Sequence, residues 1–175
     1  MPQKVLLLVS VGGPPPTLLK DLEGPLATHL GLTVVASKVA LPRPDYAFNK
    51  DRSQYHCNAI MRRLVTLLEP GQNLVMGVTD ADLFVPDSAF VFGEADRESH
   101  SAVLSTARLR AGADLDQLRR RVQVEGVHQA GHLLGLSYCE ELRCVMFFAQ
   151  SPVDSDRKQL GLCNVCRNEL AKLNR

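Results

Sequence analysis

Two histidines at helical spacing are the first residues of this chain whose types and positions could do chemistry. His128 and His132 lie four positions apart, so in a helix both imidazoles share one face about one turn apart. Both rings can therefore reach the same metal ion. Gly135 follows three residues later and allows the helix to end and the chain to turn back. This stretch predicts a metal-binding helix.

Two residues of this stretch differ from what metal-dependent peptide hydrolysis requires. In the pattern His-Glu-x-x-His, the glutamate takes a proton from the zinc-bound water. Gln129 stands at that position, and its amide can hydrogen-bond a water but cannot accept its proton near neutral pH. The extended pattern places a third histidine three residues after the glycine, where this chain has Tyr138. A phenol has a pKa of about 10 and becomes a good ligand only through the charge of the metal.

Four of the five cysteines form a second pattern directly after Tyr138. Cys139 and Cys144 make one close pair, and Cys163 and Cys166 make another with the spacing Cys-x-x-Cys. Each pair can supply two thiolates from one short turn, as a tetrahedral four-cysteine zinc site requires. Two disulfides are the alternative, but such pairs in a chain without an export signal more often hold metal. We therefore expect one structural zinc on these four residues.

Together, the two patterns resemble the archaemetzincin family of zinc metallopeptidases. The histidine stretch runs directly into Cys-x-x-x-x-Cys, Met146 follows two residues later, and the second cysteine pair lies further on. The resemblance extends upstream through residues 49–55, 77–83 and 90–95, and so covers most of the chain. It implies a metzincin-like fold with a catalytic zinc on three histidines, a second zinc on four cysteines, and a methionine turn beneath the active site.

The family's functional residues can be carried over position by position. His128 and His132 match the first two catalytic ligands, and Met146 matches the turn methionine. The structural-zinc ligands match Cys139, Cys144, Cys163 and Cys166. Gln129 replaces the base and Tyr138 replaces the third ligand. These departures bear on the activity and on the second zinc, whereas the resemblance leaves the expected fold unchanged.

Length and composition fit one enzyme-sized domain. With 175 residues, of which 45% are hydrophobic, the chain can bury one core but is too short for two ordinary domains. We expect a single domain, in which residues 1–136 form an N-terminal subdomain with the active-site helix and residues 137–175 a small zinc-pinned subdomain. The chain has 20 Lys plus Arg against 19 Asp plus Glu, a balance that suggests neither a nucleic-acid nor a membrane partner.

The N-terminal apolar run over residues 5–9 needs a separate interpretation. It is too short for a secretory signal and is followed by a Gly-Gly-Pro-Pro-Pro turn, so it reads as a buried first strand. No segment approaches the length of a membrane span. We therefore expect a cytoplasmic protein, whose reducing surroundings keep the zinc thiols unoxidised.

Strands alternate with helices along the chain, which predicts an α/β (α+β) fold of zincin type with a mixed twisted sheet. Strands are expected over residues 5–9, 32–39, 74–79, 89–93 and 102–108. Helices are expected over residues 17–30 (kinked or split at Gly24–Pro25), 53–68, 113–134, and from 154 or 155 to about 173. The helix over 113–134, with an apolar stripe of Leu115, Leu118 and Val122, would deliver the two histidines to the edge of the sheet.

A few other residues have both a functional and a structural interpretation. Residues 90–93 are expected either to pair as an edge strand with an extended peptide, the binding mode of the family, or to be an ordinary edge strand. Glu125, one turn before Gln129, can act as a displaced base only if it lies within hydrogen-bond reach of the water. Met146 is expected in the core. Cys57 and the other histidines (His29, His56 and His100) show no ligand spacing.

Three functions remain open on these observations. The first is a metzincin-fold zinc protein whose peptidase activity is lost or nearly lost and which still binds a peptide or partner. The second is an active peptidase with zinc on His128, His132 and Tyr138. The third is a structural or interaction protein held by its four-cysteine zinc. The number of zinc ions per chain separates the second from the others, and binding of an extended peptide separates the first from the third.

Overall fold

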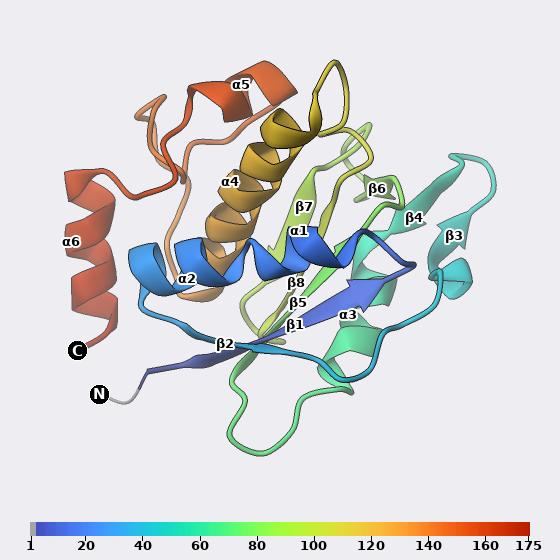
Figure 1. Ribbon diagram of the computed structural model, residues 1–175, viewed down its shortest axis with the longest axis horizontal. Coiled ribbons are helices and arrows are strands. Elements are labelled where there is room, and N and C mark those ends of the chain that lie inside the picture. Colours follow the sequence, from blue (N-terminus) through green and yellow to red (C-terminus); the bar gives the residue numbers. More distant parts are fainter. Residues whose placement is uncertain (1–2) are drawn as a thin grey trace.

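Five strands form the central sheet of the protein, whose computed structural model describes residues 3–175 (Figure 1). The strands lie in the order β2 (Thr33–Ala36), β1 (Val5–Val11), β5 (Leu74–Thr79), β8 (Ser101–Ser105) and β7 (Gly93–Asp96). The first four run parallel to one another, and β7 runs antiparallel to β8. The sheet is therefore mixed, as predicted, and β2 and β7 are its edge strands.

Side chains of the central strands alternate between two apolar cores. Leu6 and Leu8 of β1 contribute to one core, while Leu7 and Val9 contribute to the other. Successive side chains of a strand point to opposite faces of the sheet, so an unbroken apolar run can fill both cores. All residues of β5 and β8 are likewise buried. Such continuous apolar runs are typical of strands that are covered on both faces.

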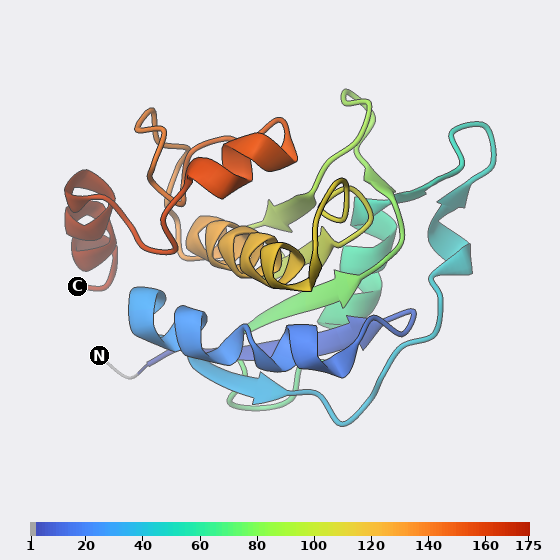
Figure 2. The same ribbon diagram turned by 45° about the horizontal axis from the view of Figure 1, so that its top comes forward.

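Helices cover both faces of this sheet (Figure 1, Figure 2). One face packs against α1 (Pro16–Lys20), α2 (Glu23–Leu30) and α4 (Leu115–Leu133), and the other packs against α3 (Cys57–Val65). Beyond α4 lie α5 (Pro152–Arg157) and α6 (Asn164–Leu173). A small second sheet joins β3 (Phe48–Asn49), β4 (Gln54–His56) and β6 (Leu83–Phe84), with the 3-10 turn η1 (Asp45–Ala47) just before β3.

The helix α4 carries the two histidines and begins at a capping box. The Asp114 carboxylate accepts a hydrogen bond from the backbone N–H of Gln117 at 2.8 Å, and the Gln117 side chain accepts one from the Asp114 N–H at 3.1 Å. These bonds satisfy two of the N–H groups that a helix start leaves unpaired. From Val124 onward almost every residue of α4 is buried, whereas Leu115 is 68% exposed. Leu115 was therefore wrongly assigned to the apolar stripe, because the first turn of the helix lies at the surface.

An ion pair between a buried arginine and a partly exposed aspartate fastens the C-terminal part of the chain to α4. The Arg121 guanidinium donates two hydrogen bonds to the Asp156 carboxylate of α5, both at 2.8 Å. The same guanidinium donates to the backbone carbonyls of Leu109 and Ala111 at 2.7 and 2.9 Å. Arg121 holds the pKa of the Asp156 carboxyl below its usual value. Three segments that are distant in sequence thus meet at one side chain.

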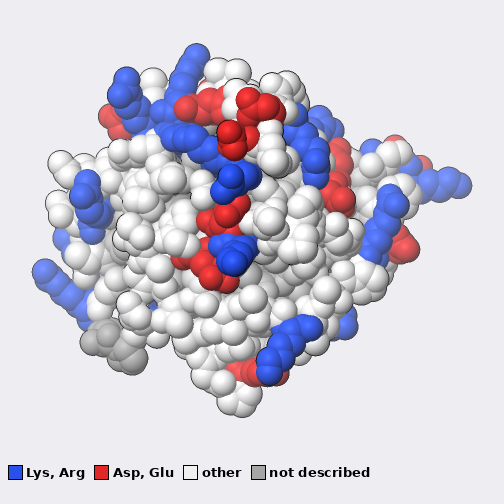
Figure 3. Space-filling view, viewed as in Figure 1, with Lys and Arg blue, Asp and Glu red and all other residues white. Residues whose placement is uncertain are grey.

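Charged residues of both signs are mixed on one face of the molecule (Figure 3). On the face shown in Figure 3, basic and acidic side chains lie next to one another rather than in one-sign fields. Arg119 of α4, for example, pairs with Asp21 at 2.7 Å. Within the described residues, no helix combines the length and the apolar character that crossing a membrane requires.

Most predicted elements are confirmed, with shifted ends. The strand over residues 74–79 is confirmed at both ends, β1 continues two residues beyond residue 9, and β2 and β8 are shorter than predicted. The helix over 17–30 is split, but at Asp21–Leu22 instead of Gly24–Pro25. Pro25 is the third residue of α2, where a helix leaves the backbone N–H unpaired in any case and proline is tolerated.

Three predictions were wrong because contacts with distant residues decide the local structure. Residues 54–56 form β4 instead of the start of a helix, since they pair with β3 and β6. Residues 89–92 precede the edge strand instead of forming it, and Val91 bonds to Leu83 across an isolated bridge. The predicted final helix is two helices, α5 and α6, because residues 158–163 turn back toward α4 and the cysteines.

Candidate metal centres and adjoining cleft

His128 and His132 face each other on one side of α4. Their Nε2 atoms are 3.2 Å apart. Their Nδ1 atoms lie 2.8 Å from the Val145 carbonyl and 2.9 Å from the Leu136 carbonyl, respectively. A carbonyl can only accept, so each Nδ1 carries the proton and each Nε2 presents a lone pair. Two lone pairs at this separation repel unless a cation lies between them, so the pair fits a metal ion held by both Nε2 atoms.

Burial keeps this histidine pair in the form that metals bind. It lowers the pKa of His128 well below its usual value, with the charges of Lys158 and His132 acting in the same direction. Burial also lowers the pKa of His132. Neutral imidazole is the ligand form, so neither ring has to lose a proton when metal binds near neutral pH.

Lys158 is a buried residue of this site that the sequence did not reveal. Its side chain is 1% exposed, and its Nζ donates to the Val145 carbonyl at 3.0 Å and lies 3.5 Å from His128 Nδ1. Burial lowers its pKa. The Val145 carbonyl therefore accepts from both the imidazole and the lysine, which links the histidine pair to the segment after α5. A single lysine in an irregular segment offers no periodicity from which this contact could be predicted.

Tyr138 lies beside both histidines, as its position in the motif predicts. The centroid of its ring is 4.6 Å from that of His132, 5.7 Å from that of His128 and 5.0 Å from that of Phe148. Its side chain remains 57% exposed. Burial of its hydroxyl, together with the charges of Glu94 and Glu125, raises the pKa of the phenol. The third ligand position is thus occupied by a phenol with a raised pKa.

Gln129, at the position of the base, is bound to a buried carboxylate. Its Nε2 donates to Glu125 Oε2 at 2.6 Å, and the two residues are 5% and 3% exposed. Burial raises the pKa of Glu125, against the opposing effects of Gln129 and Lys158. A side chain on Gly93 would not fit, because its Cβ would lie 2.9 Å from Gln129 Nε2 and 3.0 Å from Glu125 Oε2. Glycine here lets β7 approach α4 closely enough to cover this pair.

A cleft of about 670 Å³ opens beside His128 and Gln129. One wall is formed by residues 85 and 88–94, and the other by Tyr138 and residues 148–150. The first wall contributes Phe90 and Phe92, whose ring centroids are 5.4 Å apart. The cleft is therefore largely apolar, with polar groups of α4 at its base.

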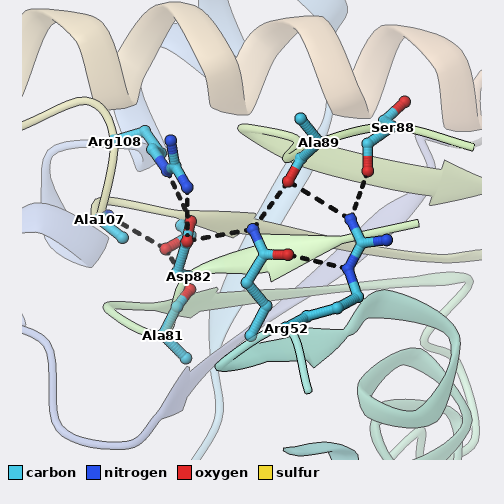
Figure 4. A network of polar contacts seen from close by, with 9 residues as sticks. Arg52, Ala81, Asp82, Ser88, Ala89, Ala107 and Arg108 are labelled. Atoms are coloured by element: carbon cyan, nitrogen blue, oxygen red, sulfur yellow. Dashed lines mark hydrogen bonds and ion pairs between the residues drawn. The ribbon is translucent and has the colours of Figure 1, made fainter. Parts of the chain in front are cut away.

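Side chains from the small sheet hold the first wall of this cleft (Figure 4). Arg52 Nη2 donates to the Ser88 carbonyl at 2.5 Å, and Gln54 Nε2 donates to the Ala89 carbonyl at 2.9 Å. Gln54 Nε2 also donates to Asp82 Oδ2 at 3.1 Å. The backbone of the wall thus depends on residues more than 30 positions earlier in the chain.

Arg108 completes this network from the segment after β8 (Figure 4). It donates two hydrogen bonds to the Asp82 carboxylate, at 3.0 and 2.9 Å, and its guanidinium lies 4.3 Å from the centroid of the Phe90 ring. These contacts restrict the movement of the wall. They also give a structural role to the stretches 49–55 and 77–83, which carried the upstream resemblance without any assigned chemistry.

The four cysteines of the second pattern lie together near α6. The Sγ atoms of Cys139, Cys144, Cys163 and Cys166 are all within 4.8 Å of one another. Two of the separations, Cys139–Cys163 and Cys144–Cys166, are 3.8 and 3.7 Å. Zinc–sulfur bonds of about 2.3 Å in a tetrahedron place the sulfurs about 3.8 Å apart, whereas a disulfide needs about 2.05 Å. The spacing fits zinc and does not fit the disulfide alternative.

Met146 is fully buried beneath α4, as predicted. Its Sδ atom lies 2.5 Å from the place that a Cβ on Gly131 would occupy. Gly131 stands between the two histidines, so the methionine supports the helix backbone directly under them. Two of the other positions considered in the sequence are structural: Cys57, the first residue of α3, is buried in the core, and His56 caps α3 by accepting the Asn58 N–H at 3.1 Å.

Comparisons with known proteins agree with this arrangement. The family model described as Peptidase family M54 matches residues 26–172. The archaemetzincin of Methanocaldococcus jannaschii is 35% identical over 158 residues, which cover 87% of this chain and 85% of the relative. The archaemetzincin of Archaeoglobus fulgidus is 38% identical over 148 residues, which cover 83% of this chain and 88% of the relative.

Solved structures show the same likeness in three dimensions. The crystal structure of archaemetzincin from Methanopyrus kandleri superposes with a TM-score of 0.86 at 32% identity, and the match covers 98% of this chain and 96% of that one. The crystal structure of archaemetzincin from Archaeoglobus fulgidus complexed with malonate gives a TM-score of 0.80 at 32% identity, covering 94% of this chain and 99% of that one.

Proposed function

Because the chain belongs to the archaemetzincin family of zinc metallopeptidases, peptidase family M54, we propose that it is a zinc-binding member whose peptidase activity is lost or strongly reduced. The observation that carries this proposal is the hydrogen bond from Gln129 Nε2 to Glu125 Oε2 at 2.6 Å. An amide held in this way donates a hydrogen bond through Nε2, and its oxygen is too weakly basic to take a proton from a water near neutral pH. Loss of a general base typically lowers the rate about a hundredfold to ten-thousandfold.

The two metal sites differ in the ligands they offer. At the cysteine cluster, four sulfurs at zinc-compatible distances support tight binding of one structural zinc. At the histidine pair, two imidazoles and a phenol with a raised pKa support only weak binding of a second. A zinc ion there would polarise a substrate carbonyl and lower the pKa of a bound water. His128 and His132 would hold it, and their Nδ1 bonds would orient both rings.

We propose that the cleft binds an extended peptide segment. Within residues 3–175, the strand β7 pairs only with β8 and so leaves one side free as the edge of the five-stranded sheet. An extended peptide can add to such an edge through backbone hydrogen bonds, with alternate side chains entering pockets. The apolar cleft between residues 88–94 and 148–150 supplies such a pocket. We also propose a reducing cytoplasmic location, which would keep the cysteine thiols free for zinc.

An active peptidase is the second candidate, and one contact favours it. Tyr138 stands next to both histidines, with its ring centroid 4.6 Å from that of His132, so a metal-bound phenolate is within reach of this arrangement. Glu125 would then be the carboxylate closest to the base position, since it already binds Gln129.

Zinc content and hydrolysis of the wild-type protein decide between these functions. We expect one zinc per chain by elemental analysis after purification without added metal, and no chelator-sensitive cleavage of an unstructured peptide. The control is the same assay with an excess of zinc. Two zinc ions per chain together with chelator-sensitive cleavage would establish the active enzyme. One zinc without any binding of extended peptides would leave only a structural or interaction role.

A further inference from the structure

We propose that a hollow next to His132 binds a carboxylate group and that Arg97 is the residue that recognises it. The hollow measures about 300 Å³ and adjoins the cleft at Tyr138, which lines both. It is lined by Arg97, His132, Gly135, Leu136, Ser137 and Tyr138. If the carboxylate belongs to a peptide, this inference rests on the proposed peptide binding in the cleft. It then specifies that the bound peptide carries an acidic side chain or a free C-terminus at this point.

The position of Arg97 depends on the bare backbone of Gly135. A Cβ on Gly135 would lie 2.6 Å from Nη2, 2.8 Å from Cζ and 3.2 Å from Nη1 of Arg97, so the guanidinium rests directly on this glycine. Gly135 has a φ of +105°, in the region where other residues are strained, and it directly follows the last turn of α4. The C-terminal end of a helix attracts a cation, which favours this placement of the guanidinium.

Arg97 has no anionic partner within the described part of the chain. Neither an ion pair nor a side-chain hydrogen bond joins it to any of residues 3–175, although its side chain lines the hollow. Five other arginines each pair with an aspartate: Arg43, Arg108, Arg119, Arg121 and Arg157. None of the residues that line the hollow is acidic. The positive charge of Arg97 is therefore available to a ligand.

The groups around Arg97 suit a carboxylate. A guanidinium presents parallel N–H donors that match the two oxygens of a carboxylate. Ser137 and Tyr138, which also line the hollow, carry hydroxyl groups that can donate hydrogen bonds. None of the side chains that line the hollow carries a negative charge.

The hollow also lies where a peptide bound at the sheet edge would end or turn. Arg97 directly follows β7 (Gly93–Asp96), the proposed template for the peptide. A peptide paired parallel to β7 would bring its C-terminal carboxylate to Arg97, and a peptide paired in either direction would reach Arg97 with an acidic side chain at the matching position. The site thus favours acidic peptides or free C-termini over neutral segments.

Two small probes test the site without requiring pairing with β7. N-acetylglycine carries a carboxylate, and N-acetylglycinamide has the same shape without the charge. We expect the acid to shift the NMR signals of the Arg97 side chain and the Tyr138 ring, whereas the amide leaves them unchanged. Arg97→Gln should weaken binding of the acid about tenfold or more, because it removes a charge-assisted bidentate contact. Arg97→Lys should retain part of the affinity as a point charge.

Arg62→Gln is the matched control, since it removes the same charge from an exposed position on α3. The inference would be overturned if the wild-type protein bound the acid and the amide equally, or did not bind the acid. It would also be overturned if Arg62→Gln and Arg97→Gln lost equal affinity for the acid. These probes are too short to pair with β7, so their failure leaves peptide binding in the cleft unaffected.

Three versions of one peptide then identify the source of the carboxylate. They carry a free C-terminus, an amidated C-terminus, or an amidated C-terminus with one internal glutamate. We expect Arg97→Gln to weaken the preferred acidic version and to leave the neutral one unchanged. Equal binding of all three by the wild-type protein would overturn the carboxylate preference while supporting the cleft. Binding of none would contradict the proposed peptide function instead.

Discussion

The four-cysteine cluster and the histidine pair lie on either side of Tyr138, and they differ in how many ligands the chain supplies. In the cluster, four sulfurs come within 4.8 Å of one another from two separate segments. At the histidine pair, two nitrogens at 3.2 Å face a tyrosine ring. A structural zinc needs all four ligands from the protein, whereas a catalytic zinc needs three and a water. The first site therefore offers a full set of structural ligands, whereas at the second we expect Tyr138 to be a weak ligand and Gln129 not to act as a base.

This difference separates what the fold needs from what catalysis needs. The cluster connects residues 139–144 to α6, and its zinc would take part in the folding of the C-terminal segment. The histidine rings are held by the backbone carbonyls of Val145 and Leu136. Because these bonds come from the chain itself, we expect the rings to keep their orientation without a metal ion.

The largest expected effect is the loss of the cysteine site in Cys163→Ser. Zinc binding at such sites contributes on the order of 10 kcal/mol, so this variant should lose its zinc and the structure of the C-terminal segment. Elemental analysis and thermal unfolding measure both. Cys57→Ala is the control, because Cys57 is buried outside the cluster and should keep the zinc. Full zinc content in Cys163→Ser would show that the cluster is not the zinc site.

The next effect concerns repair of the histidine site. Gln129→Glu with Tyr138→His should restore a base and a third ligand together and raise hydrolysis of an unstructured peptide by about a hundredfold or more. Each single change should recover little activity. Gln129→Glu supplies a base but no better-held metal, and Tyr138→His supplies a metal ligand but no base. All four proteins are assayed with equal zinc and with a chelator. Strong activity in either single variant would contradict this interdependence.

A smaller effect is expected at the ion pair between Arg121 of α4 and Asp156 of α5. Asp156→Asn leaves the Arg121 charge buried without its partner and should destabilise the protein by about 1 to 3 kcal/mol near neutral pH. Chemical denaturation measures this change in the free energy of unfolding. The matched control is Asp116→Asn, whose carboxylate is exposed and should contribute little.

The same pair predicts a pH dependence. Because Arg121 lowers the pKa of Asp156 in the folded protein, the unfolded chain takes up the proton first as the pH falls. The stabilisation is therefore complete above the ordinary aspartate pKa of about 3.9 and is lost as the pH falls through the lowered value. Asp156→Asn should remove this part of the acid sensitivity, and an unchanged profile would show that the pair does not contribute.

The smallest effect is expected for Tyr138→Phe. A phenol whose pKa is raised by burial is a weak ligand, so its removal should lower the affinity for a second zinc by less than about tenfold. Titration with zinc, or with cobalt as a spectroscopic substitute, measures this affinity. Loss of all binding in Tyr138→Phe would make Tyr138 a true ligand and favour the active peptidase.

Local sequence patterns were sufficient to predict those features whose residues lie within a few positions of one another. The length of α4 and the facing histidines follow from spacing and side-chain type. Both cysteine pairs were visible for the same reason, and so was the family resemblance that the comparisons confirmed. Predictions failed where pairing with distant residues decides the structure, as at β4 and at residues 89–92.

The sequence by itself determined the inventory of the two sites: four thiols in two pairs, two imidazoles, and an amide and a phenol in place of a base and a ligand. Only the tertiary structure decided how these groups are held. The Val145 carbonyl orients His128 from 17 positions away, and Lys158 reaches it from 30 positions away. Arg97 lies on Gly135 because the turn after β7 meets the end of α4. Such contacts join segments whose proximity depends on the packing of the whole chain, which no local pattern encodes.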